Sequence, residues 1–215
     1  MRFDALFLIL ALLAAVFAIV AFAQRLRSFN SLPRPTDRAT PKGDTASGVL
    51  YAFTLGMLPW AKESTRRHWL AYMRGVGFHA MIFLSLALLV ISPWFGQLPI
   101  GSRDILAICA GAGAALAFAG IVMRAVEPNL KALSTRDDYF AVLIVGLFMT
   151  TAAAALINPA LVWMFWLVSA VMLVYMPLGK IRHCIYYAYS RLFFGRAIGS
   201  RGVLAGHNGP YQAAR

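Results

Sequence analysis

The chain has 215 residues, of which 60% are hydrophobic and 13% are charged. This composition excludes an ordinary soluble domain and indicates an integral membrane protein, with room for about five or six helical spans of about 20 residues each. The formal net charge of +12 fits basic loops that face anionic lipid headgroups. Because no recognition module accompanies this charge, we expect membrane lipid rather than nucleic acid as its partner.

Five apolar segments predict an all-α bundle of five transmembrane helices. Every basic-rich segment between them falls on one side of the membrane if the N-terminus is outside and the C-terminus is cytoplasmic, as the positive-inside rule requires. We therefore expect a multi-pass protein of a bacterial-type cytoplasmic (inner) membrane. Gly and Ala are frequent between residues 111 and 120, which would let another helix or a flat porphyrin approach closely. The predicted spans are residues 5–23, 76–94, 105–123, 139–157 and 160–178.

The first segment has a second interpretation, because its Ala-Phe-Ala at residues 21–23 resembles a signal-peptidase site. A signal peptide carries its positive charge ahead of the apolar core. Here more positive charge follows the core, at Arg25 and Arg27. We therefore predict an uncleaved anchor.

The remaining segments predict one membrane domain over residues 1–195. Residues 25–47 are polar and contain three prolines, which favours an irregular cytoplasmic loop. Residues 48–60 are apolar but too short to span, so we expect them to lie at the interface or to re-enter the membrane. The basic and aromatic stretch 62–74 fits a helix along the cytoplasmic headgroups. A basic, glycine-containing cytoplasmic tail is predicted over residues 196–215.

Two histidines stand out in this arrangement. His79 lies a turn or two inside the second span, and His183 lies at the end of the fifth. A titratable side chain in hydrocarbon is costly, so such a residue needs a function. The predicted orientation places both histidines in the cytoplasmic leaflet, and we expect them to be the axial ligands of one haem b. Two axial histidines leave no open iron position, which suits electron transfer. Candidates for binding the haem propionates are Arg74, Lys180 and Arg182, with ordinary membrane-flanking charge as their alternative role.

His68 is the alternative ligand. It precedes His79 by 11 residues, which returns to nearly the same face of a helix and would suit a second haem. We expect Gly75 and Gly77 to interrupt that helix, and the spare partner, His207, lies in the tail. An interfacial or partner-contacting role is therefore favoured for His68, and a solvated tail position for His207.

Three motifs resemble those of a known family. Phe78-His79 opens an apolar run, residues 134–139 read Ser-Thr-Arg-Asp-Asp-Tyr, and residues 176–183 read Met-Pro-Leu-Gly-Lys-Ile-Arg-His. They are similar to the second helix, the start of the fourth helix and the end of the fifth helix in the haem-containing gamma subunits of respiratory nitrate reductases. Related membrane subunits occur in the Dsr sulfur-metabolism complexes and the heterodisulfide reductases. The resemblance covers about residues 50–195.

The resemblance implies a cytochrome b-type subunit that passes electrons between membrane quinone and a cytoplasmic iron-sulfur subunit, without a catalytic site of its own. Nitrate reductase gamma subunits carry a second haem toward the outer face. The matching places here hold Leu89 and Phe165, which cannot ligate iron, so one haem is expected. The alternative is a haem-free membrane anchor or transporter component whose histidines are satisfied within the bundle.

Overall fold

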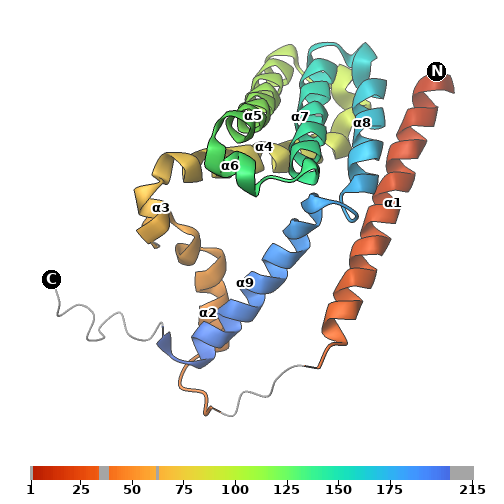
Figure 1. Ribbon diagram of the computed structural model, residues 1–215. Coiled ribbons are helices and arrows are strands. Elements are labelled where there is room, and N and C mark those ends of the chain that lie inside the picture. The colour runs from red at the N-terminus through yellow and green to blue at the C-terminus, as the bar shows by residue number, and fades with distance from the viewer. Residues whose placement is uncertain (1, 34–38, 62, 204–215) are drawn as a thin grey trace. The chain divides into compact units, whose positions relative to one another are not determined.

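The computed structural model describes residues 2–33, 39–61 and 63–203, and every regular element in these ranges is helical (Figure 1). Four of the helices are long and apolar enough to cross a membrane. A bent pair, Pro159–Tyr175 with Lys180–Ser200, provides a fifth crossing if it counts as one span. The all-α class is confirmed, and the chain is a multi-pass membrane protein.

The first, third and fourth predicted spans fall within α1, α5 and α7, whereas the second begins inside α4 and runs on into η3. The α-helices are α1 (Arg2–Asn30), α2 (Thr45–Phe53), α3 (Glu63–Arg67), α4 (Trp69–Ile91), α5 (Ile100–Val126), α6 (Pro128–Leu133), α7 (Arg136–Ile157), α8 (Val162–Tyr175) and α9 (His183–Ser200). The 3₁₀ turns are η1 (Leu55–Met57), η2 (Pro59–Ala61), η3 (Ser92–Gln97), η4 (Pro159–Leu161) and η5 (Lys180–Arg182).

Two compact units divide the chain. The first comprises Met1–Arg25 and Met73–Arg182, and the second comprises Leu26–Tyr72 and His183–Arg215. The single membrane domain over residues 1–195 stays a prediction.

Close helix contacts organise the first unit. Gly113 of α5 faces α4 and α7, and a Cβ atom at this position would lie 2.5 Å from Met81 Cβ and 2.6 Å from Met149 Sδ. Small residues allow such approach in membrane bundles, where dispersion and packing hold helices together. α5 therefore packs along α7 (Figure 1), whereas its close approach to α4 is local, at Met81.

A buried aromatic stack fills another part of the first unit. Phe165 of α8 stacks on Phe148 of α7 and on Phe95 of η3, with ring centroids 5.3 Å and 6.2 Å apart, and all three side chains are fully buried. The adjacent Trp166 Nε1 donates a hydrogen bond to Ser92 Oγ at 2.7 Å. These contacts fix η3 and α8 to the core.

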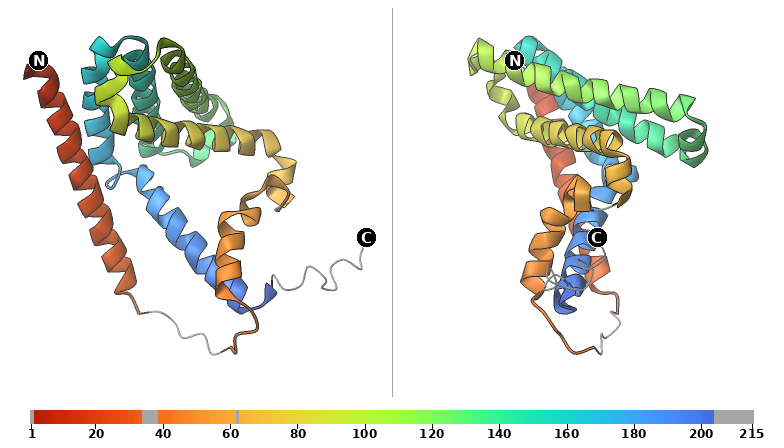
Figure 2. Two further views of the ribbon diagram at one scale, coloured as in Figure 1. Left: turned by 180° about the vertical axis from the view of Figure 1, so that it is seen from behind. Right: turned by 90° about the vertical axis from the view of Figure 1, so that its left-hand side faces the viewer.

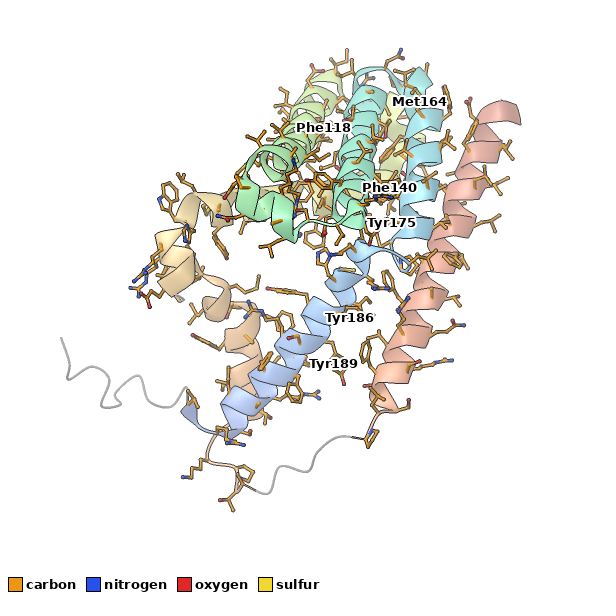
Figure 3. All side chains as sticks on the ribbon, in the orientation of Figure 1. Phe118, Phe140, Met164, Tyr175, Tyr186 and Tyr189 are labelled. Carbon is orange, nitrogen blue, oxygen red and sulfur yellow. The ribbon has the colours of Figure 1, made fainter. Side chains whose placement is uncertain are left out.

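The second unit is built on the pair α2 and α9, which lie side by side (Figure 2). Gly48 of α2 meets the backbone of α9 at Gly195 and Gly199, and a Cβ atom at Gly48 would lie 2.5 Å from Gly199 Cα and closer still to the Gly195 carbonyl oxygen. The two backbones are therefore in direct contact. Tyr186 and Tyr189 of α9 (Figure 3) pack on Phe29, with centroid distances of 5.2 Å and 5.6 Å.

The connections differ from the sequence predictions in three places. The predicted loop 25–47 is shorter, because α1 continues to Asn30 and α2 begins at Thr45, capped by Asp44; within the loop, residues 34–38 lie outside the described residues. The expected interruption at Gly75 and Gly77 is wrong, since α4 runs through both. Glycine is tolerated at these positions because, in an apolar surrounding, no water competes for the backbone hydrogen bonds of the helix. The third difference concerns the fifth span.

The fifth span ends earlier than predicted and resumes in a new direction. α8 ends at Tyr175, and the helix that starts at Lys180 is bent by 70° from it. Pro177 has no N–H to donate to the preceding turn, and its ring clashes with a continuing helix. Gly179 then lies directly on the Tyr175 ring, where a Cβ atom would overlap the ring carbons. Pro177 and Gly179 together explain the break.

Candidate functional site

His79 lies on α4 in the first unit, and a backbone contact orients its ring. The imidazole Nδ1 is 2.7 Å from the carbonyl oxygen of Gly75, one turn earlier. A carbonyl only accepts hydrogen bonds, so Nδ1 carries the proton in this contact. Nε2 is consequently the nitrogen that would face a metal. The His79 side chain is exposed.

The surface of α4 next to His79 is lightly covered. A Cβ atom at Gly75 would meet no atom within 4 Å, and one at Gly77 would meet only Leu116 Cδ1, at 3.6 Å. The Phe78 ring lies edge-on to the imidazole, with centroids 5.5 Å apart. Because Gly75 and Gly77 have no side chains, the part of α4 just before His79 has room for a flat ligand.

His183 is the first residue of α9 and belongs to the second unit. Its side chain is also exposed. The two predicted ligands therefore lie in different units, and their joint ligation of one iron stays a prediction. His68 is an exposed residue between α3 and α4, and His207 lies outside the described residues.

Two of the three predicted propionate partners have local contacts. The Arg74 guanidinium points to Met123 Sδ on α5. An Arg182 guanidinium nitrogen donates to the Leu178 carbonyl oxygen at 3.3 Å. Among the described residues neither arginine forms an ion pair with a carboxylate, so the charge of each is not already neutralised by one.

The third candidate, Lys180, belongs to a polar cluster at the start of α7. Its ammonium nitrogen lies 3.1 Å from the Asp138 carboxylate. Next to this pair, the Tyr175 hydroxyl donates to Asp137 Oδ1 at 2.5 Å. Phe140 packs edge-on against the Tyr175 ring, with centroids 4.8 Å apart (Figure 3).

Sequence reasoning missed Tyr175, because a tyrosine near the end of an apolar run is typical of a membrane-interface anchor. The charged residues nearby did contain a signal for this cluster. Asp137 and Asp138 open one span, and Lys180 closes another on the same predicted side of the membrane. Opposite charges at equal depth on adjacent helices favour a contact.

Among the described residues, no group of three or more His, Cys, Asp or Glu side chains is arranged to hold a metal ion. A haem with two axial histidines needs only two protein ligands and no such group. No protein-family model, curated protein or solved structure matches the chain. The resemblance to the gamma subunits accordingly rests on the three sequence motifs.

Proposed function

We propose that the chain is a haem b-binding electron-transfer subunit of a membrane oxidoreductase complex, with His79 and His183 as the axial ligands. The observation that carries the proposal is the contact between His79 Nδ1 and the Gly75 carbonyl. Metal-bound histidines commonly donate their second ring nitrogen to a carbonyl or carboxylate, which fixes the tautomer and the ring orientation. When bound, haem b supplies reversible one-electron transfer.

The residues present fit this group in their chemistry. Two imidazoles complete the coordination of a haem iron, and the open surface at Gly75 gives a porphyrin room beside His79. Arg74 and Arg182 are our candidates for neutralising the propionates. Lys180 is a further candidate, although its pairing with Asp138 gives it a competing role.

The aromatic stack supports one haem rather than two. In the related gamma subunits a second haem lies toward the outer face, and the place of one of its ligands corresponds to Phe165. That ring is fully buried between Phe148 and Phe95. Leu89, at the place of the other ligand, packs partly buried against the same core. Packed apolar side chains thus stand at both places where a second haem would need a ligand.

The proposed partners follow from the motifs and from the charge pattern. We propose a nitrate reductase gamma-like subunit in a bacterial-type cytoplasmic membrane, with the N-terminus outside. Electrons would pass between the quinone pool and a cytoplasmic iron-sulfur subunit. The orientation is supported by the basic residues that follow the first, third and fifth apolar segments or precede the second: Arg25, Arg27, Arg66, Arg67, Arg74, Arg124, Lys131, Lys180, Arg182, Arg191 and Arg196.

Optical spectroscopy and iron analysis of the purified full chain test the proposal. We expect a b-type reduced-minus-oxidised spectrum and about one iron per chain. His79→Ala and His183→Ala should each abolish the low-spin signal, because a missing axial ligand opens the iron coordination sphere. His68→Ala is the matched control, since it removes an exposed histidine outside the proposed site, and it should retain the signal.

Three results would contradict the proposal. Absence of a b-type signal together with undetectable iron would favour the haem-free anchor or transporter component. Low-spin haem retained in either of the first two variants would reject that ligand. Two irons per chain, with one lost in His68→Ala, would show that the second-haem interpretation was correct.

A further inference from the structure

The second unit carries most of the excess positive charge of the chain. Its two segments, Leu26–Tyr72 and His183–Arg215, contain 11 Lys and Arg residues against 3 Asp and Glu, whereas the larger first unit contains 9 against 5. The described part of the second unit also exposes large apolar side chains, among them Leu50, Phe53, Trp60, Trp69, Phe193 and Phe194. A surface that is both basic and aromatic is typical of the boundary between water and lipid.

On α9 the two kinds of side chain share one face. Tyr187, Arg191, Phe194 and Ile198 follow one another at spacings of four, three and four residues, which places them in one stripe along a helix. We call these four residues the Arg191 face of α9. The contact with α2 is made through glycines on a different side of the helix. Tyr187 and Phe194 accordingly stay 44% and 57% exposed.

The Tyr187 ring holds the charge of this face in place. The Arg191 guanidinium carbon lies 5.2 Å from the centre of the Tyr187 ring, and Arg191 Nε donates to the Tyr187 hydroxyl at 3.2 Å. The nitrogens of a guanidinium form a fork that matches the oxygens of a phosphate. Among the described residues Arg191 forms no ion pair with a carboxylate. An aromatic ring therefore orders this charge without neutralising it, which suits the binding of an anion.

The position of Arg191 within α9 favours the membrane surface over the hydrocarbon. Arg191 is the ninth of the 18 residues of α9, so its charge would lie near the bilayer centre if α9 crossed the hydrocarbon as one span. A charge at that depth is costly. At the surface the same residue is favourable, because its guanidinium meets headgroup phosphates while the neighbouring rings enter the boundary of the acyl chains.

We propose that the Arg191 face of α9 binds the headgroups of anionic phospholipids. Arg191 binds the lipid phosphate, and Tyr187 and Phe194 lie against the upper part of the acyl chains. The charge of the second unit selects an anionic over a zwitterionic lipid, because each basic residue near the membrane surface adds to the attraction. Neither haem nor an iron-sulfur partner enters this inference.

Photo-crosslinking of the full chain in phosphatidylcholine nanodiscs tests this binding. The discs would contain a small, equal amount of either phosphatidylglycerol or phosphatidylcholine with a photoreactive group near the top of one acyl chain, and mass spectrometry would map the crosslinked peptides. We expect the glycerol lipid to label α9 more strongly, and less so at raised salt, where the screening length shortens. Arg191→Gln should lower this labelling by about fivefold, the effect of one arginine at an anionic surface. Arg191→Lys keeps the charge without the fork and should lower it less.

Lys131→Gln is the matched control, because it removes one positive charge from an exposed residue of the first unit and should leave the labelling of α9 unchanged. Circular dichroism would show whether each variant keeps its helix content. Equal labelling of α9 by the two lipids would overturn the proposal, and so would anionic labelling that survives Arg191→Gln. An α9 that neither lipid labels would also overturn it and would favour an acidic protein surface as the ligand of this face.

Discussion

Replacing Gly48 by alanine should separate α2 from α9. The added Cβ would lie 2.5 Å from Gly199 Cα, and ordinary van der Waals contact begins near 3.4 Å, so the helices must part by at least about 0.9 Å. The opposing atoms belong to the α9 backbone and cannot rotate away. Overpacking of this kind costs about 1–3 kcal/mol, and the better helix propensity of alanine offsets up to about 1 kcal/mol. We therefore expect a net loss of about 1–2 kcal/mol.

Hydrogen exchange measured by mass spectrometry would detect this loss in the second unit. A change of about 1–2 kcal/mol corresponds to a roughly 5- to 30-fold shift in the local opening equilibrium, so α2 amides should exchange faster by about that factor. Gly111→Ala is the control, because a Cβ atom at Gly111 meets nothing within 4 Å. This control should be neutral or stabilising by about 0.4–1 kcal/mol. Unchanged exchange in Gly48→Ala, or an equal acceleration in both variants, would refute the backbone contact.

Two further predictions concern α5 and the start of α2. Gly113→Ala should lower the free energy of unfolding by about 1–3 kcal/mol, because its Cβ would overlap Met81 Cβ. Gly120→Ala is the control and should not lower it, because a Cβ atom at Gly120 meets nothing within 4 Å. Denaturation of both variants in mixed micelles measures the difference. Hydrogen bonds from the Ser47 side chain and from backbone N–H groups lower the pKa of Asp44. The carboxylate cap therefore stabilises α2 above the ordinary aspartate pKa, and this stabilisation is lost as the pH falls through the lowered value. Amide exchange at the start of α2 should accelerate over that acidic range in the wild type and stay flat in Asp44→Asn.

The apolar spans could be predicted because a bilayer leaves the backbone few alternatives to a helix. The bend after α8 could not be predicted with the same security. Pro177 and Gly179 are compatible both with a kinked continuous helix and with a full break, and the contacts of Tyr175 and Lys180 with α7 decide between them. The opposite error occurred at Gly75, where low helix propensity was outweighed by the membrane setting of α4.

Candidate site residues were accessible from the sequence where their polarity contrasted with their surroundings. His79 is such a residue, because it interrupts an apolar run. The orientation of its ring toward the Gly75 carbonyl depends on a rotamer that the sequence does not encode locally. The contact of Gly48 with Gly195 joins positions nearly 150 residues apart, and neither glycine differs in sequence from an ordinary loop glycine.

The helices of the first unit differ in length, and this has a consequence for the surrounding lipid. α5 has 27 residues and rises about 40 Å, whereas η4 and α8, with 3 and 14 residues, together rise about 27 Å. The apolar part of α5 between Asp104 and Arg124 has 19 residues and rises about 28 Å, so a hydrocarbon layer of about 30 Å accommodates it and leaves both charged ends of α5 in the headgroup regions. The same layer is slightly too thick for η4 and α8. The slightly short apolar length at α8 favours a dimple in the leaflet beside it. We therefore expect acyl-chain length to act on α8, whose end is followed by the turn that carries Lys180.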